Sequence, residues 1–248
     1  MITVIGLRGI PLIREGDDLG RIIVTAAEDQ GVGIEEGDVI VVTQKIVSKA
    51  EGRKVALSEV TPSRFAEEIA IRTGKDPRLA GVILRETSRI VKMRGQHLIM
   101  ETKQGFVCAN AGVDRSNVEG TDHVCLLPED PDRSARTIRN RIKELTGKSP
   151  AVIITDTWGR PWRLGQTDFA IGIAGMRPFR DYRGKRDMFG YKLRVTNICV
   201  ADELASAAEL VKGKSQGIPV VIIRGYSYPR GGGSAREIVR PIEEDLFR

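Results

Sequence analysis

Three short runs of aliphatic residues constrain the fold of this chain more than any other feature. They occupy residues 38–43 (DVIVVT), 151–155 (AVIIT) and 219–223 (PVVII). Apolar runs of this length, rich in Val and Ile and bounded by polar residues or Gly, predict buried strands. We expect the first strand to continue through Lys45. These three strands supply the β part of the fold.

Helical patterns and shorter strands fill the segments between these runs. Helices are predicted from Asp17-Asp18 to about Gly31, from Pro62 to Gly74, and over residues 77–93, 132–146 and 202–212. Further strands are predicted at 97–101, 105–109 and 168–174, and the segment from Arg230 reads as a flexible loop entering a last helix, which Pro241 interrupts. Because helices and strands do not alternate steadily, the pattern predicts an α+β fold and not a doubly wound one.

The composition is that of a globular protein without a membrane span. Of the 248 residues, 41% are hydrophobic and 29% are charged, which excludes a disordered chain. No apolar stretch is long enough to cross a bilayer, and the N-terminus lacks the features of a signal peptide. We therefore expect a cytoplasmic protein in which residues 1–248 form a single unit, because no linker is apparent and the pattern marks no lobe boundary.

The few cysteines and histidines limit the kinds of metal site and catalytic site that this chain can form. The three cysteines, Cys108, Cys125 and Cys199, are widely separated and match neither a disulfide framework nor paired zinc-ligand spacing. Only His97 and His123 are available for a zinc site or a His-centred triad. Any metal bound here is therefore expected to have oxygen ligands.

Two polar segments that follow apolar strands supply such oxygens. Asp156 and Thr157 come directly after the 151–155 run, and Asp114, Ser116 and Asn117 lie in the segment NAGVDRSN. Carboxylate and hydroxyl oxygens suit Mg²⁺ or Mn²⁺, especially when phosphate completes the coordination shell. Each segment also has a structural interpretation, as a turn cap at Asp156 and as an Asx-rich turn at Asp114. If both carboxylates meet, they form the kind of site that phosphoryl transfer needs.

Basic residues offer candidate phosphate contacts. Strand alternation would place Lys45 and Lys49 on one face, where they could meet a polyphosphate or simply protect an edge strand. The sequence Gly213-Lys-Ser resembles the end of a Walker A motif, but Ala208 occupies the position of its first Gly. The predicted order, helix before and strand after, is also the reverse of a P-loop, so that fold is rejected. The segment 213–217 can still hold phosphate through its backbone, or be only a helix cap and turn.

The net charge of +6 and the isoelectric point near 9.3 allow two classes of partner. Nucleic acid is one, and an anionic small molecule is the other. The basic residues are dispersed except in the segment 177–186, and no nucleic-acid-binding signature accompanies them. That segment is either a contact for an anionic substrate or a solvated basic loop.

Taken together and in this order, the segments resemble the coenzyme F420-0:L-glutamate ligases, the γ-glutamyl ligase family of coenzyme F420 biosynthesis. The matching stretches are residues 9–18, 41–53, 110–117, 154–163, 201–210 and 213–220, so the resemblance covers essentially the whole chain. It implies a homodimer of α+β subunits, each with two lobes, whose sheets intertwine around an active-site groove.

The resemblance also implies the reaction. GTP, with Mg²⁺ or Mn²⁺, would phosphorylate the terminal carboxylate of F420-0, and the amine of L-glutamate would attack the acyl phosphate. The products would be an amide, GDP and phosphate, and a second round would add a γ-linked glutamate. The partners are thus small molecules and a second copy of the chain, with no nucleic acid and no membrane.

Family roles can be placed on individual residues through the matching motifs. Asp114, Asp156 and Lys45 would be catalytic. Asp114 and Asp156 would hold one divalent cation, Thr157 and Gln216 would hold a second, and a monovalent cation is a further candidate. The family pattern has a carboxylate at the position of Gln216, whose neutral amide is a weaker cation ligand. GTP would contact Ile10, Pro11, Leu12, Ile13, Lys45, Asn117, Gly213, Lys214, Ser215, Gln216, Gly217, Ile218, Pro219 and Val220.

Two other functions are compatible with the same residues. A GTP-dependent kinase would stop after phosphoryl transfer, and would release GDP without forming an amide. A basic RNA-binding protein would account for the charge, although aromatic residues make up only 5% of the chain and no stacking platform is visible. Strong dependence of RNA binding on salt would identify the latter.

Overall fold

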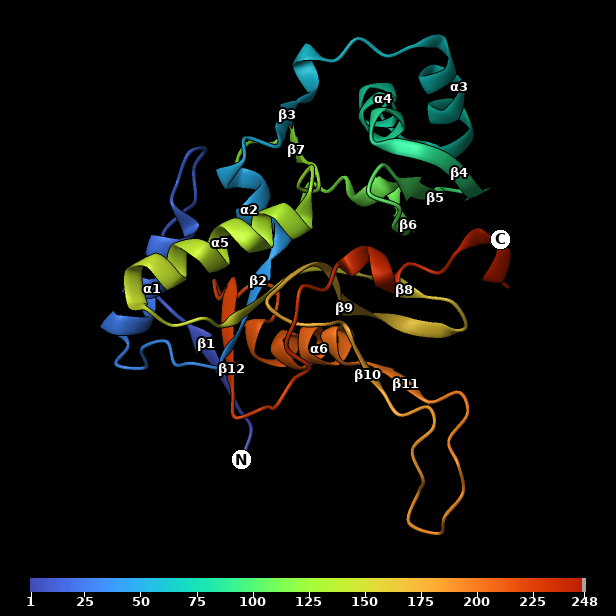
Figure 1. Cartoon of the computed structure of the whole chain (residues 1–248). Coiled ribbons are helices and arrows are strands. Elements are labelled where there is room, and N and C mark those ends of the chain that lie inside the picture. Colours follow the sequence, from blue (N-terminus) through green and yellow to red (C-terminus); the bar gives the residue numbers. More distant parts are fainter. Residues whose placement is uncertain (247–248) are drawn as a thin grey trace.

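The computed structural model describes residues 1–246 and is built around a mixed five-stranded sheet (Figure 1). The strand order is β1-β12-β2-β8-β9, in which β2 and β8 are parallel and the other neighbours are antiparallel. The strands are β1 (Thr3–Leu7), β12 (Val220–Arg224), β2 (Val39–Thr43), β8 (Ala151–Arg160) and β9 (Arg163–Ala174). All three predicted apolar runs are therefore strands, and they are adjacent in one sheet.

Helices on both sides explain why these three strands are apolar along their length. Helix α5 (Pro131–Thr146) packs on β8 and β9, with α1 (Leu19–Asp29) beside it, and α6 (Val200–Lys212) contacts β9, β1 and β12 from the opposite side (Figure 1). Val39–Val42 and Val220–Ile222 are fully buried. A strand covered on both faces needs apolar side chains in both directions.

Strand β8 is longer than predicted, and this corrects the position of Asp156. The sequence predicts a strand over residues 151–155, with Asp156 and Thr157 at its end and a loop from Trp158 onward. The strand instead continues to Arg160 and turns directly into β9, so Asp156 and Thr157 lie inside a hairpin, opposite Phe169 and Asp168. The apolar run stops at residue 155 because the hairpin leaves the covered part of the sheet there, while strand pairing continues.

Helix α2 (Gln44–Ala50) corrects a second prediction, that β2 continues through Lys45. The chain turns into a helix directly after Thr43, and Ile46 and Val47 join the core. Lys45 and Lys49 nevertheless share one side, because residues four apart are neighbours on a helix. The two lysines therefore do share a face, as predicted, but it is the face of a helix and not of a strand.

A second hydrophobic core lies in the segment between α2 and α5. It is formed by α3 (Arg64–Thr73), α4 (Pro77–Arg85) and the sheet β4-β5-β6, which comprises Thr87–Arg94, His97–Thr102 and Val107–Ala109. Strands β3 (Lys54–Ala56) and β7 (His123–Cys125) form a small sheet that joins the two cores. The helix predicted over 77–93 ends at Arg85, because the residues from Thr87 onward pair with β5 instead.

Two peripheral segments complete the fold. Strands β10 (Phe179–Asp181) and β11 (Asn197–Cys199) begin and end a long loop that projects away from the body (Figure 1). The expected last helix is only two 3₁₀ turns, Ala235–Ile238 and Ile242–Glu244. The preceding loop is tied down, because Asp132 accepts hydrogen bonds from Ser234 Oγ (2.5 Å) and the Ala235 N–H (3.1 Å). Within residues 1–246, no helix is long and apolar enough to cross a membrane.

Candidate active site

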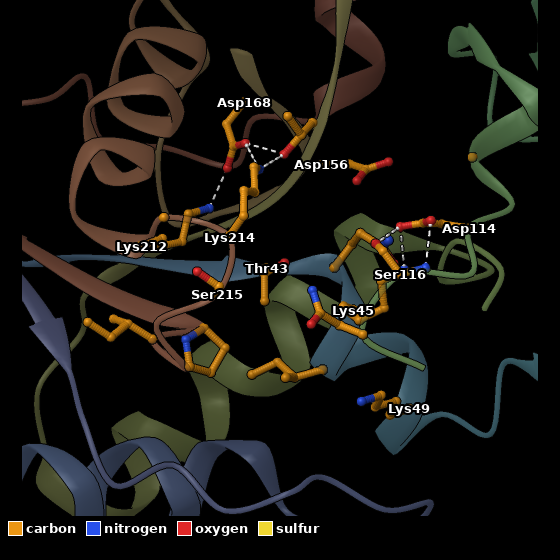
Figure 2. A pocket seen from close by; sticks show the side chains of 18 of the residues that line it. Thr43, Lys45, Lys49, Asp114, Ser116, Asp156, Asp168, Lys212, Lys214 and Ser215 are labelled. Carbon is orange, nitrogen blue, oxygen red and sulfur yellow. Dashed lines mark hydrogen bonds and ion pairs between the residues drawn. The ribbon is translucent and has the colours of Figure 1, made fainter. Parts of the chain in front are cut away.

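A cavity of about 640 Å³ gathers polar residues from segments that are distant in the sequence. Helix α2 and the β8–β9 hairpin line the cavity on the side of the central sheet, and the loop after β6 lines it on the side of the second core (Figure 2). The segment between α6 and β12 closes another side. Among the predicted residues, those that line it are Ile10, Pro11, Leu12, Ile13, Lys45, Asp114, Asn117, Asp156, Thr157, Gly213, Lys214, Ser215, Gly217, Ile218 and Pro219.

Two of the predicted nucleotide contacts do not line this cavity. Val220 is fully buried as the first residue of β12. Gln216 is exposed, and its side-chain amide lies next to Gly213. The order of elements here is helix α6, loop and then strand β12, as expected, so the rejection of a P-loop is confirmed.

Asp114 forms one side of the site and is held by two partners. Its Oδ2 accepts a hydrogen bond from Lys45 Nζ at 2.8 Å and one from Ser116 Oγ at 2.5 Å, while Oδ1 accepts one from the Ser116 N–H at 2.9 Å. Burial acts to raise the pKa of Asp114, but Lys45 and Ser116 outweigh it and hold that pKa below its ordinary value. The Ser116 N–H contact is an Asx turn, so the structural interpretation of this loop is confirmed. Asp114 also lines the cavity, so its role as a cation ligand stays a prediction that the geometry allows.

Asp156 lies between two other carboxylates. Its side chain lies between those of Asp114 and Asp168 (Figure 2). Burial raises its pKa to about 6, and the negative charges of Asp114 and Asp168 act in the same direction, whereas Lys45 opposes them. Burial and the two neighbouring carboxylates make the ionised form of Asp156 unfavourable. A cation bound beside Asp156 would offset that cost.

Asp168 is the main site residue that the sequence did not reveal. It lies on β9, is only 2% exposed, and pairs with Lys212. Its carboxylate also accepts hydrogen bonds from the hydroxyl groups of Thr155 (3.0 Å) and Thr157. The one available signal was the repetition of Thr-Asp at 155–156 and 167–168, but only the β8–β9 register shows that Thr157 and Asp168 are opposite each other.

Two lysines near the end of α6 approach Asp168 from different environments. Lys212 is 5% exposed and donates to Thr155 Oγ1 at 2.6 Å as well as to Asp168. Lys214, on the following loop, is 59% exposed and donates to Thr157 Oγ1 at 2.5 Å, with Asp168 Oδ1 at 3.5 Å. Figure 2 shows both ammonium groups beside Asp168. Lys212 is thus a fixed counter-ion, and Lys214 reaches the cavity from a solvent-exposed loop.

Comparison with known proteins identifies the family. A family model described as F420-0:Gamma-glutamyl ligase matches residues 8–225. The chain belongs to the F420-0:γ-glutamyl ligase family. It is 47% identical to the coenzyme F420:L-glutamate ligase of Methanothermobacter thermautotrophicus, over all of this chain and 99% of that protein. Identity is 45% to the ligase of that name from Methanocaldococcus jannaschii (100% and 97% covered) and 48% to that from Methanopyrus kandleri (95% and 93% covered).

Lys49 adds to the positive charge of this γ-glutamyl ligase cavity. It lines the cavity one helical turn after Lys45. Burial lowers its pKa, and the nearby charges of Lys45 and Lys54 add to that effect. Ammonium groups thus reach the cavity from two sides: those of Lys45 and Lys49 from α2, and that of Lys214 from the segment after α6.

The acidic residues of this family member do not form a complete metal site by themselves. In the described part of the chain, no group of three or more His, Cys, Asp or Glu side chains is placed to hold one metal ion. Asp114, Asp156 and Asp168 are instead spread around the cavity. This arrangement suits cations that take part of their coordination shell from a phosphate chain, as Mg²⁺ commonly does.

Proposed function

We propose that this chain is a GTP-dependent coenzyme F420-0:L-glutamate ligase that acts as a homodimer. Its full-length identity of 45–48% to proteins named coenzyme F420:L-glutamate ligase supports the substrates. The convergence of Asp114, Asp156 and Lys45 in one cavity supports the reaction type. The proposed products are an amide between F420-0 and glutamate, then a second γ-linked glutamate, with one GDP and one phosphate formed per addition.

The chemistry requires activation of a carboxylate, which is a poor electrophile. A carboxylate oxygen of F420-0 attacks the γ-phosphorus of GTP, the bond from that phosphorus to the β-phosphate oxygen breaks, and GDP leaves. The amine of glutamate then attacks the acyl carbon, phosphate leaves with the bonding electrons, and the nitrogen loses a proton. Positioning and charge stabilisation are sufficient for both steps, so no side-chain nucleophile is needed.

The residues of the cavity match these requirements. Lys45, Lys49 and Lys214 bring ammonium groups to the cavity that would receive a phosphate chain, and residues 213–215 and 217–219 line the same space. Lys45 is 9% exposed and is held by Asp114, so its charge is fixed in position before any substrate binds. Fixed charges of this kind act on a transferring phosphoryl group without the cost of reorganisation.

The acidic residues fit divalent cations. Asp114 and Asp156 would hold one ion, and Thr157 would contribute to a second, alongside a monovalent cation. Gln216, the other predicted ligand of the second ion, lies outside the lining of the cavity. The raised pKa of Asp156 is the observation that supports this assignment, since a cation there would relieve the cost of the buried charge. When bound, such ions supply positive charge that neutralises the phosphoryl group during its transfer.

The decisive observation is the position of Asp156, and its removal tests the proposal. Asp156→Ala should abolish the formation of glutamylated F420-0 from GTP, glutamate and Mn²⁺, as measured by mass spectrometry, while circular dichroism shows an unchanged fold. Asp29→Ala, which removes an exposed carboxylate at the end of α1, should keep full activity. Product formation by Asp156→Ala at the wild-type rate would reject the assignment.

The same assay separates a ligase from a kinase. A kinase would release GDP from GTP and F420-0 alone and would form no amide when glutamate is added. A ligase forms GDP and amide in equal amounts, and both depend on glutamate at steady state.

A further inference from the structure

The environment of Lys214 resembles a cation site that is filled by a side chain. Its ammonium group lies 2.5 Å from Thr157 Oγ1, 3.5 Å from Asp168 Oδ1 and 3.7 Å from Glu209 Oε1. These oxygens come from β8, β9 and α6 respectively. A hydroxyl and two carboxylates are the hard oxygen ligands that Mg²⁺ and Mn²⁺ prefer.

The two oxygens of Asp168 have different partners. Oδ2 faces the buried Lys212 and Thr155, which fix the carboxylate in place. Oδ1 faces Thr157 and the exposed Lys214 and belongs to the cavity wall. Oδ2 is therefore held by buried partners, while Oδ1 can bind a cation in the cavity.

Lys214 and Lys212 also differ in their freedom to move. Lys212 belongs to the last turn of α6 and is 5% exposed, so moving it would separate two buried charges from their principal counter-charge. Lys214 lies beyond the helix, and its side chain is 59% exposed. It can leave its oxygens for water or for a phosphate group at little cost.

We propose that Lys214 occupies the position of the second divalent cation when nucleotide is absent, and that Asp168, instead of Gln216, supplies the carboxylate oxygen for that cation. On binding of the metal–nucleotide complex, the ammonium group moves from Thr157 and Asp168 to the phosphate chain. This inference rests on the proposed GTP-dependent function, because it assumes that a nucleotide phosphate chain enters this cavity.

The test is a titration with Mn²⁺ alone, followed by the electron paramagnetic resonance signal of the free ion. Lys214→Met removes the competing charge and should tighten the weaker class of Mn²⁺ sites by about tenfold. The same variant should bind a non-hydrolysable GTP analogue more weakly, because it has lost a phosphate contact. Lys214→Arg, which keeps the charge, should stay close to the wild type for Mn²⁺.

Three matched controls separate this effect from others. Lys148→Met changes an exposed lysine in a second Gly-Lys-Ser sequence and should alter neither affinity. Lys49→Met removes a charge from the same cavity without touching Thr157 or Asp168, and should tighten Mn²⁺ binding much less than Lys214→Met does. Gln216→Ala should leave Mn²⁺ binding unchanged.

The outcomes are distinct. The proposal that Lys214 occupies the cation position would be overturned by an unchanged Mn²⁺ affinity in Lys214→Met. It would also be overturned if Lys49→Met raised the Mn²⁺ affinity as much as Lys214→Met does. If Gln216→Ala lost the weaker Mn²⁺ site, Gln216 and not Asp168 would be the ligand of the second cation. If the wild type forms no glutamylated product, the proposed function fails, whatever the Mn²⁺ titrations show. If it forms product while the titrations contradict the predictions, only the present inference fails.

Discussion

Single residues in the cavity serve both stability and the proposed chemistry, and Asp168 shows this most directly. The carboxylate and the ammonium of Lys212 are 2% and 5% exposed, and each is the other's principal charge partner. Removing one member of a buried ion pair leaves an uncompensated charge, which is costlier than removing both. A residue that organises the site is therefore also one on which the fold depends.

Asp168→Asn should lower the free energy of unfolding by about 3–5 kcal/mol in urea denaturation. The double variant Asp168→Asn/Lys212→Met should recover a measurable part of that loss, because no charge is then left unpaired. A loss below about 1 kcal/mol in the single variant, the size of an exposed pair, would show that the pair is effectively solvated.

At the scale of secondary-structure elements, short local features fix where the helices begin. The carboxylate of Asp76 caps α4 by accepting a hydrogen bond from the Arg78 N–H at 2.8 Å, and Pro77 occupies the first helical turn. Hydrogen bonds from the Arg78 guanidinium lower the pKa of Asp76 from 3.8 to about 2. The ionised carboxylate therefore stabilises the fold fully above about pH 4, and this contribution is lost as the pH falls toward 2.

Asp76→Ala should lower the free energy of unfolding by about 1 kcal/mol at neutral pH, the usual value of an N-cap. Urea titrations between pH 6 and pH 3 should show the difference from the wild type narrowing below about pH 4. A difference that stays constant or widens as the pH falls would contradict the role of the ionised carboxylate.

Packing between β9 and α5 depends on the absence of a side chain at Gly172. A Cβ there would lie 2.3 Å from the carbonyl oxygen of Pro131, a backbone atom at the start of α5. Gly172→Ala should therefore cost about 1–3 kcal/mol or more in chemical denaturation, through displacement of the helix. Gly159→Ala in the same hairpin, where a Cβ meets nothing within 4 Å, should have a small effect, and equal effects would refute the explanation.

At the scale of the whole molecule, the proposed homodimer accounts for apolar side chains at the ends of two projecting segments. Leu164, near the tip of the β8–β9 hairpin, is fully exposed, and Met188 and Phe189 in the loop between β10 and β11 are 89% and 88% exposed. Apolar side chains that are exposed at the ends of projecting segments become buried when another chain covers those ends.

Leu164→Asp should shift the mass measured by light scattering from dimer toward monomer. Ile71→Asp, which alters an equally apolar and 84% exposed residue on α3, should leave the dimer intact. A wild-type protein that is monomeric at micromolar concentration would refute the dimer itself.

The sequence alone determined the three apolar strands at the centre of the main sheet and several of the polar residues of the cavity. The runs at 38–43, 151–155 and 219–223 were identifiable as strands because strands covered on both faces must be apolar throughout. Asp114, Asp156 and Lys45 could be selected because oxygen ligands beside ammonium groups suit phosphate chemistry, and matching motifs pointed to the same positions. Neither argument required knowledge of which segments meet.

Only the tertiary structure decided which residues are neighbours. Lys45 lies on a helix because the chain turns after Thr43, and residues 87–94 form a strand because β5 is there to pair with them. Asp168 belongs to the site because the hairpin register places it opposite Thr157. Strand pairing depends on contacts between distant segments, and a local pattern can indicate that a strand is buried without indicating which segment lies beside it.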